Sequence, residues 1–361
     1  MMLITLPVSF LTVSCSGVDE QKNLKIDMES SVRVPTFELP ISPLLSEDTL
    51  KALKHRKKYT DEAGRVASKC PAIVADNITE ISSIRQCHAD AFYTTAWYKS
   101  LIARYDVIMT SQDIGGVYTE VFTPEEGLSP ENRSRVLINL HGGGFRYGSY
   151  INSHLESIPI SSVGKIKVVS IDYRMAPEHQ FPAASEDVAA VYRELLKTYK
   201  PENIGIYGCS AGGTLAAQSM AWFRKEGLPM PGAIGMFCAA AKWAGDSTVY
   251  GWFLEGYDFG TMPPLKRDYL EGVDRENVLV SPLVSDEMMR SFPPSLLISS
   301  TRDVGLSSVV ATHSKLRSLG KTADLHVWEG LGHAFMYDPN IPESREVYDV
   351  ITDFFDQHLG R

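Results

Sequence analysis

The sequence I-G-I-Y-G-C-S-A-G-G-T-L occupies residues 204–215. Its first four residues form an apolar run typical of a buried parallel strand. The run breaks at G-C-S-A-G, which matches the pattern G-x-S-x-G, and a helix-like stretch follows. A strand, a Gly-flanked Ser and a helix in this order place the serine on a sharp turn with its hydroxyl exposed. The pentapeptide alone also fits a chance turn, but the other motifs favour Ser210 as a nucleophile.

Strand and helix signals alternate on both sides of this turn. The strand candidates are 107–109, 117–123, 136–140, 167–172, 204–208, 233–238, 295–300 and 324–328. The helix candidates are about 183–199, 211–226, 307–319 and 344–358. The first two strands flank Gly115-Gly116, which is typical of an antiparallel edge pair. The remaining alternation predicts an α/β protein with a mostly parallel, doubly wound, eight-stranded sheet.

The composition divides the chain into four segments. We expect a signal peptide over 1–15, a linker over 16–45, a helical cap over 46–104 and a catalytic domain over 105–361. Ser46 is predicted to cap the first helix, and one helical stretch is predicted over 81–104. A plain N-terminal helical extension is the alternative to a cap. Residues 242–282 are aromatic and Gly-rich, which predicts a second cap segment, a pocket lining or an ordinary insertion.

The N-terminal segment carries a targeting signal in this interpretation. Residues 3–14 are apolar and uncharged, too short to span a bilayer but suited to the core of a signal peptide. L-T-V-S-C at 11–15 resembles a bacterial lipobox and predicts a lipid anchor at Cys15, although no Lys or Arg precedes the apolar run. We expect an exported protein, periplasmic or anchored as a lipoprotein, or a cytoplasmic one if the segment is not a signal. Cys70 and Cys87 either form a disulfide, if the protein is exported, or are two free thiols.

Charge and composition argue against several classes of protein. The formal net charge is −9 and no Lys/Arg-rich run occurs, which argues against nucleic acid as a partner. None of the five Cys residues forms a C-x-x-C pair, so a zinc site is not expected. The glycines at 142–144 are followed by no Walker lysine and fit no G-x-G-x-x-G frame, which argues against a phosphate loop. We therefore expect neither a metal nor a cofactor.

A serine nucleophile needs a base, and the base needs a carboxylate behind it. His333 follows the last predicted strand on a Gly-containing loop, and Asp303 stands just past another predicted strand. Open α/β sheets place their sites at these strand ends. The alternatives for the two roles are His88, His179, Asp172 and Asp187. Both alternative aspartates precede Ser210, whereas the order Ser, Asp, His is the one expected for this kind of turn.

Another motif, H-G-G-G-F at 141–145, directly follows the apolar run 136–140. Consecutive glycines let the chain approach a substrate closely and point several N–H groups inward. We predict that the backbone N–H groups of Gly142, Gly143 and Ala211 stabilise the oxyanion.

Taken together, the motifs resemble those of the hormone-sensitive-lipase-like (GDSAG-type) esterases of the α/β-hydrolase superfamily. The matching motifs are H-G-G-G-F at 141–145, D-Y-R-M-A-P-E-H-Q-F-P-A-A at 172–184, G-C-S-A-G-G at 208–213, T-R-D at 301–303 and G-H-A-F at 332–335. The resemblance covers about 105–361, and the preceding helices look like that family's cap. It implies the α/β-hydrolase fold with an N-terminal helical cap.

The resemblance also assigns roles. It implies that Ser210 is the nucleophile, Asp303 the acid and His333 the base, and that Glu178 buttresses the active-site loops. It implies hydrolysis of carboxylic esters with short or medium acyl chains, without a metal. Two positions depart from the family: Cys209 stands where Asp or Thr is most frequent, and Ala334 replaces the usual Gly after the histidine.

We therefore expect a serine carboxylesterase that acts on a small-molecule ester through an acyl-enzyme. The alternatives are an acyltransferase on the same fold and a non-catalytic member that binds a small molecule. A homodimer is expected to use the last strand and helix.

Overall fold

The computed structural model describes residues 38–73, 79–254 and 267–360. The predicted signal peptide, its lipid-anchored Cys15 and most of the linker lie outside these residues. Residues 41–361 make up one structural unit, and the account below concerns its described part. No described helix is both long and apolar enough to cross a bilayer.

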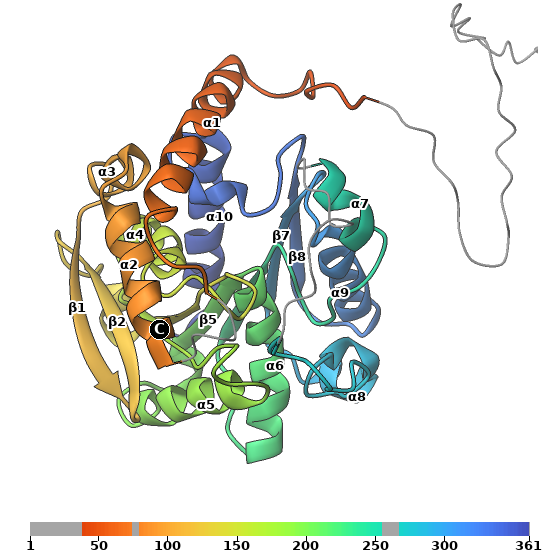
Figure 1. Ribbon diagram of the computed structural model, residues 1–361. Helices are drawn as coiled ribbons and strands as arrows, with labels where there is room; N and C mark the ends of the chain where they lie inside the picture. Colours follow the sequence, from red (N-terminus) through yellow and green to blue (C-terminus); the bar gives the residue numbers. More distant parts are fainter. Residues whose placement is uncertain (1–37, 74–78, 255–266, 361) are drawn as a thin grey trace, which may run out of the picture. The chain divides into compact units, whose positions relative to one another are not determined.

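A single eight-stranded sheet forms the centre of this unit, in the order β1-β2-β4-β3-β5-β6-β7-β8 (Figure 1). The strands are β1 (Val107–Ile114), β2 (Val117–Pro124), β3 (Val136–Leu140), β4 (Val168–Ile171), β5 (Ile204–Cys209), β6 (Ala233–Phe237), β7 (Ser295–Ser300) and β8 (Ala323–Trp328). β1 and β2 pair antiparallel around Gly115 and Gly116, whose φ angles of 65° and 81° suit a tight hairpin. β2 also pairs antiparallel with β4, and the other pairs are parallel. The predicted α/β-hydrolase sheet is confirmed.

Helices cover both faces of the sheet. One face packs against α4 (Asn152–Gly164) and α10 (Pro342–His358). The other face packs against α5 (Ala183–Leu195), α6 (Ala211–Glu226) and α9 (Leu306–Ser318). The apolar stripe of α5 follows the predicted helical spacing, and burying each of its large side chains contributes about 1.5–3 kcal/mol. The resulting doubly wound layers hold the carboxyl ends of the parallel strands in fixed positions.

Helix α4 was not expected from the sequence. Its residues 153–161 are all buried, whether apolar or polar, and Pro159 lies inside the helix. Because residues 153–161 leave no face of α4 exposed to solvent, polar and apolar residues are mixed around the helix. Its sequence therefore lacks the 3.6-residue apolar stripe by which a surface helix is normally predicted. The polar residues of α4 must therefore find partners inside the protein.

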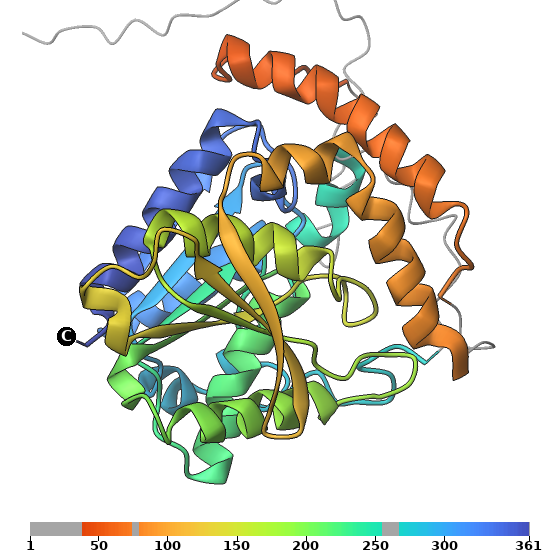
Figure 2. The ribbon, with the colours of Figure 1, turned by 90° about the vertical axis from the view of Figure 1, so that its left-hand side faces the viewer.

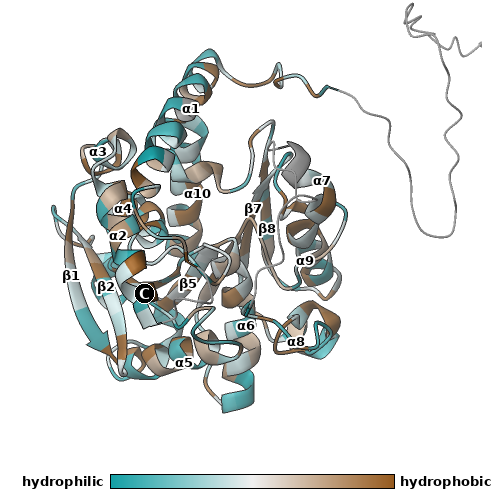
Figure 3. Cartoon of the chain, in the orientation of Figure 1, coloured by the Kyte–Doolittle hydropathy of each residue, from teal (hydrophilic) through white to brown (hydrophobic). Residues whose placement is uncertain are grey.

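The segment predicted to be a cap forms three helices along one side of the unit (Figure 2): α1 (Glu47–Ala67), α2 (Ile81–Tyr93) and α3 (Ala96–Ile102). Ser46 caps α1 as predicted, since its hydroxyl accepts the N–H of Thr49. The single stretch predicted over 81–104 is wrong, because Thr95 accepts the N–H of Tyr98 and starts a new helix. Most of α1 is hydrophilic, as Figure 3 shows, which suits its exposed outer face.

Candidate active site

Ser210 stands between β5 and α6, on the sharp turn that the sequence predicts. Its φ of 59° and ψ of −122° lie in a region that costs a non-glycine residue roughly 1–3 kcal/mol. The flanking glycines are required by the close approach of β3. A Cβ atom on Gly208 would lie 2.2 Å from the carbonyl oxygen of Leu140, and one on Gly212 would lie 1.7 Å from the same atom.

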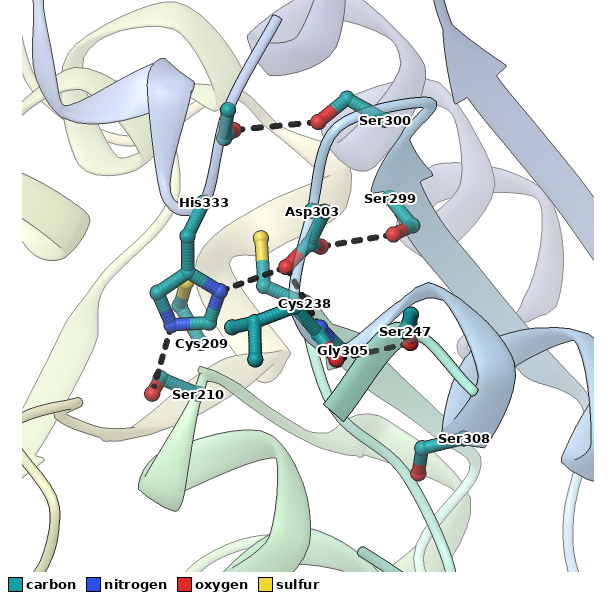
Figure 4. Close-up of polar contacts among 12 residues, drawn as sticks. Cys209, Ser210, Cys238, Ser247, Ser299, Ser300, Asp303, Gly305, Ser308 and His333 are labelled. Atoms are coloured by element: carbon teal, nitrogen blue, oxygen red, sulfur yellow. Dashed lines mark hydrogen bonds and ion pairs between the residues drawn. The ribbon is translucent and has the colours of Figure 1, made fainter. Parts of the chain in front are cut away.

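The structure brings Ser210, His333 and Asp303 into one line of hydrogen bonds (Figure 4). The Nε2 atom of His333 lies 2.9 Å from Oγ of Ser210, and its Nδ1 atom lies 2.6 Å from Oδ1 of Asp303. In the tautomer that fits both neighbours, Nδ1–H donates to Asp303 and Nε2 accepts from the serine hydroxyl. This arrangement allows His333 to take the serine proton while Asp303 fixes the ring.

Further donors hold Asp303, which is fully buried. The N–H of Gly305 donates to Oδ1 at 2.7 Å, and the hydroxyl of Ser299 donates to Oδ2 at 2.6 Å. The hydroxyl of Ser300 donates to the carbonyl of Gly332 at 3.0 Å, which ties the histidine loop to the end of β7. Asp303 is thus oriented before any substrate arrives.

The alternative acids and bases lie elsewhere. His88 bonds to the carbonyl of Pro71, and neither His88 nor His179 lines the pocket beside Ser210. Asp172 accepts hydrogen bonds from Ser149 and Tyr150, and Asp187 pairs with Arg174.

The predicted oxyanion donors need one correction. The N–H of Gly142 donates at 2.8 Å to the buried carboxylate of Glu156, so the prediction that it faces the substrate is wrong. Gly143, Gly144 and Ala211 line the pocket beside Ser210. Within the described residues, the N–H groups of these three donate to no protein acceptor. The geometry therefore supports Gly143, Gly144 and Ala211 as the oxyanion donors, with Gly144 in place of Gly142.

A pocket of about 550 Å³ opens beside Ser210 and His333. Five of its lining residues come from 242–282: Trp243, Asp268, Tyr269, Leu270 and Arg275. Of the three roles expected for this segment, the structure supports that of a pocket lining. Phe145 adds a further apolar surface. The described residues of the predicted cap do not line the pocket.

The predicted cap segment contacts the loops around the site through Arg85 of α2, a residue that the sequence did not single out. Its guanidinium donates to both carboxylate oxygens of Glu178, and to the carbonyls of Ala176 and Arg146. Arg146 directly follows the H-G-G-G-F motif. Glu178 thus lies where a buttress of the active-site loops is expected, and Arg85 is its partner.

Glu156 of α4 is a second residue that the sequence did not single out. Its carboxylate accepts hydrogen bonds from four donors: the hydroxyl of Tyr337, the N–H of Gly142, the amide of Asn139 and the N–H of Cys209. Burial raises its pKa to about 7, although these four hydrogen bonds act to lower it. No signal in the sequence marks Glu156, because it lies in the helix that the periodicity does not reveal.

One group of described residues brings metal-ligating atoms together: Cys238, Asp303 and His333, whose ligand atoms lie within 4.8 Å of one another. Asp303 and His333 already bond to each other. Burial raises the pKa of the Cys238 thiol well above its ordinary value, and a protonated thiol is a poor ligand. The hydrogen-bonded line to Ser210 accounts for the Asp and His side chains.

Comparison with known proteins agrees with this geometry. Residues 137–337 match the family model described as the alpha/beta hydrolase fold. An acetyl-hydrolase of Streptomyces hygroscopicus is 28% identical over 252 residues, covering 68% of this chain and 84% of that protein. The crystal structure of esterase E25 has a TM-score of 0.74 and 29% identity, covering 91% of this chain and 99% of that one. An esterase from the bacterial hormone-sensitive lipase family has a TM-score of 0.64 and 25% identity, covering 83% and 99%. Since the family model spans more than half of the chain, the protein belongs to the α/β-hydrolase family, within its hormone-sensitive-lipase-like branch.

Proposed function

We propose that the protein, a carboxylic ester hydrolase by its family, is a serine carboxylesterase whose acyl-enzyme forms on Ser210. The observation that carries the proposal is the line of hydrogen bonds, 2.9 Å and 2.6 Å long, from Ser210 through His333 to Asp303. A serine in this environment is activated because an adjacent base takes its proton as it attacks.

The proposed reaction has two halves. Oγ of Ser210 attacks the ester carbonyl while Nε2 of His333 takes the proton, and the oxyanion accepts hydrogen bonds from the N–H groups of Gly143, Gly144 and Ala211. The C–O bond to the alcohol then breaks, and His333 returns the proton to the leaving oxygen. In the second half, His333 takes a proton from water, the hydroxide attacks the acyl carbon, and Ser210 leaves with that proton. The products are a carboxylic acid and an alcohol.

The substrate we propose is a small ester with a short or medium acyl chain. The pocket volume of about 550 Å³ is within the usual range for small-molecule sites. Phe145, Trp243 and Leu270 give it apolar walls that suit an acyl chain or an apolar alcohol group.

The test is hydrolysis of chromogenic esters from acetyl to palmitoyl by the wild-type protein and by Ser210→Ala. We expect turnover to fall as the chain lengthens, and Ser210→Ala to abolish it while the variant stays folded. A fluorophosphonate probe should label only the wild-type protein. Unchanged turnover in Ser210→Ala would refute the assignment. Adding an acceptor alcohol and finding acyl transfer in preference to hydrolysis would favour the acyltransferase.

We also propose that the protein is exported. The support is the disulfide between Cys70 and Cys87, since such bonds persist in oxidising compartments. Cell fractionation, with mass spectrometry of the mature N-terminus, tests both export and lipidation at Cys15. The expected homodimer through the last strand and helix stays a prediction; β8 is an edge strand with Val327 40% exposed, and the mass in solution tests it.

A further inference from the structure

The carboxylate of Glu156 lies beneath the site and contacts the backbone or side chain of several segments at once. Oε1 accepts the hydroxyl of Tyr337 at 2.5 Å and the N–H of Gly142 at 2.8 Å. Oε2 accepts the amide of Asn139 at 2.8 Å and the N–H of Cys209 at 3.3 Å. We propose that Glu156 is a positioning residue of the esterase, which holds the nucleophile, the oxyanion loop and the histidine loop in register from below. This inference rests on the proposed function.

The donors belong to the segments that carry the chemistry. Cys209 directly precedes Ser210, and Gly142 directly precedes the two glycines that line the pocket. Tyr337 ends the short helical turn Phe335–Tyr337, which begins two residues after His333. A shift of any one segment relative to the other two would lengthen a hydrogen bond to Glu156.

The packing around Gly142 shows how closely these segments meet. A Cβ atom at this position would lie 2.6 Å from the hydroxyl of Tyr337, 2.9 Å from the carbonyl oxygen of Cys209 and 3.4 Å from Oε1 of Glu156. The backbone φ of Gly142 is not in the left-handed region, so space, and not conformation, requires glycine here. The three segments converge on the carboxylate with no room for another atom.

Only an ionised carboxylate satisfies this set of partners. The N–H groups of Gly142 and Cys209 and the amide of Asn139 can only donate in this arrangement, and a carboxylate offers two acceptor oxygens and no donor. A glutamine at position 156 has the same size but only one acceptor oxygen. Its NH₂ group would face the two donors that bond to the other carboxylate oxygen of Glu156. Leaving buried donors unpaired is costly, so the segments would move apart.

The residue next to the serine does not supply this acceptor. Cys209 stands where the resembling family most often has Asp or Thr, and its buried thiol lies 4.0 Å from the sulfur of Met336. A thiol is a weak acceptor. Glu156, reaching in from helix α4, supplies the strong acceptor beneath the turn.

The titratable groups that face Glu156 are Tyr337 from the histidine loop, Tyr207 and Cys209 from β5, and Tyr173 after β4. Tyr207 donates to the backbone carbonyl of Glu156 and not to its carboxylate. Among the described residues, no Lys or Arg bonds to this carboxylate. Burial without a cation raises the pKa of Glu156 to about 7, so its ionisation falls within the range of an activity profile.

The experiment compares Glu156→Gln with Glu120→Gln. Glu120, on β2, is also a largely buried carboxylate that bonds to α4, through His154 at 2.9 Å and Ser153 at 2.8 Å. Within the described part of the chain its carboxylate makes no hydrogen bond to Cys209, Gly142 or Tyr337, the residues that Glu156 joins. For Glu156→Gln we expect kcat on a short-chain ester to fall about 10–100-fold with KM nearly unchanged, because misplacement by about 1 Å has this effect. Fluorophosphonate labelling of Ser210 should slow in parallel. In the wild-type protein kcat should rise between pH 6 and 8 as Glu156 ionises. In Glu156→Gln the increase in kcat over the same pH interval should be smaller, because the glutamine does not titrate.

Glu120→Gln should lose stability and keep kcat, with an unchanged pH profile. If Glu156→Gln does not fold, Tyr337→Phe removes one of the four donors and should lower kcat to a smaller extent. An active wild-type protein with a fully active Glu156→Gln variant would overturn this inference alone, as would an equal loss of kcat in Glu120→Gln. A wild-type protein that neither hydrolyses esters nor takes the label would overturn the proposed function, and this inference with it.

Discussion

Arg85 of helix α2 donates to both carboxylate oxygens of Glu178, at 2.6 Å and 2.9 Å. The same guanidinium donates to the carbonyl of Arg146 at 3.1 Å, two residues beyond the glycines of the oxyanion loop. One side chain of the predicted cap segment therefore bonds both to the oxyanion loop and to the loop that carries Ala176 and Glu178. Although the described helices of the predicted cap do not line the pocket, α2 is coupled through the carbonyl of Arg146 to the glycine loop that does.

Replacing Arg85 by Ala should destabilise the protein and slow the reaction. The Arg85 and Glu178 side chains are only 11% and 20% exposed, and hydrogen bonds to charged groups contribute about 1.5–3 kcal/mol each. We expect a loss of about 2–4 kcal/mol in the free energy of unfolding, together with a lower kcat. Arg85→Lys should recover little, because a lysine cannot form the paired bonds to the carboxylate. Urea unfolding and ester turnover measure the two effects.

A matched control is Arg193→Ala. Arg193 pairs with Glu226 at the surface, with side chains 45% and 33% exposed, where an ion pair contributes about 0–1 kcal/mol. Equal losses of stability in the two variants would contradict the role given to Arg85.

Much of the fold and the central part of the site were predictable from the sequence because their signals are local. The turn around Ser210 needs glycine on both sides, and the strands on which it depends are short apolar runs. Asp303 and His333 follow strand ends, where a parallel sheet gathers its site. Ala334 has a φ of 53°, which explains why glycine is usual there in the resembling family.

The rest of the site depends on contacts that no local pattern contains. Gly142 and Gly143 are adjacent in one motif, and the sequence does not distinguish their N–H groups. Only the position of Glu156 in α4 shows that the N–H of Gly142 is already used in a hydrogen bond within the protein. That helix is buried all round, so its sequence lacks the stripe that would reveal it. Arg85 likewise lies 93 residues from Glu178.

Substituting Ala at the first and third glycines of the motif should give contrasting results. In Gly142→Ala the new Cβ atom would lie 2.6 Å from the hydroxyl of Tyr337, so neighbouring segments must move. Gly144 has open space around it, but its φ of 64° costs an alanine about 1–2 kcal/mol. Thermal unfolding should show the larger loss for Gly142→Ala, although its N–H does not face the pocket. A milder effect at Gly142 than at Gly144 would count against the packing described here.

Breaking the disulfide between Cys70 and Cys87 should destabilise the protein. Cys70 and Cys87 are 17 residues apart, and closing a loop of this size contributes about 3 kcal/mol through the entropy of the unfolded chain. We expect Cys70→Ser to lower the free energy of unfolding by this amount under oxidising conditions. In the presence of a reductant the variant and the wild-type protein should unfold alike. A difference that persists under reduction would mean that Cys70 stabilises the protein by other contacts.

The raised pKa of Glu156 makes stability and activity respond to pH in opposite directions. The pKa is about 7 in the folded protein against 4.5 ordinarily, so the folded state binds more protons between these values and its stability falls as pH rises. Relative to Glu156→Gln, the wild-type protein should lose about 2–3 kcal/mol of unfolding free energy between pH 5 and pH 8. Over the same interval its kcat should rise, because only the ionised carboxylate accepts all four donors. Urea unfolding of both proteins at pH 5 and pH 8 measures the difference in unfolding free energy between them. If this difference is the same at the two pH values, Glu156 has the same pKa in the folded and the unfolded chain, and the prediction fails.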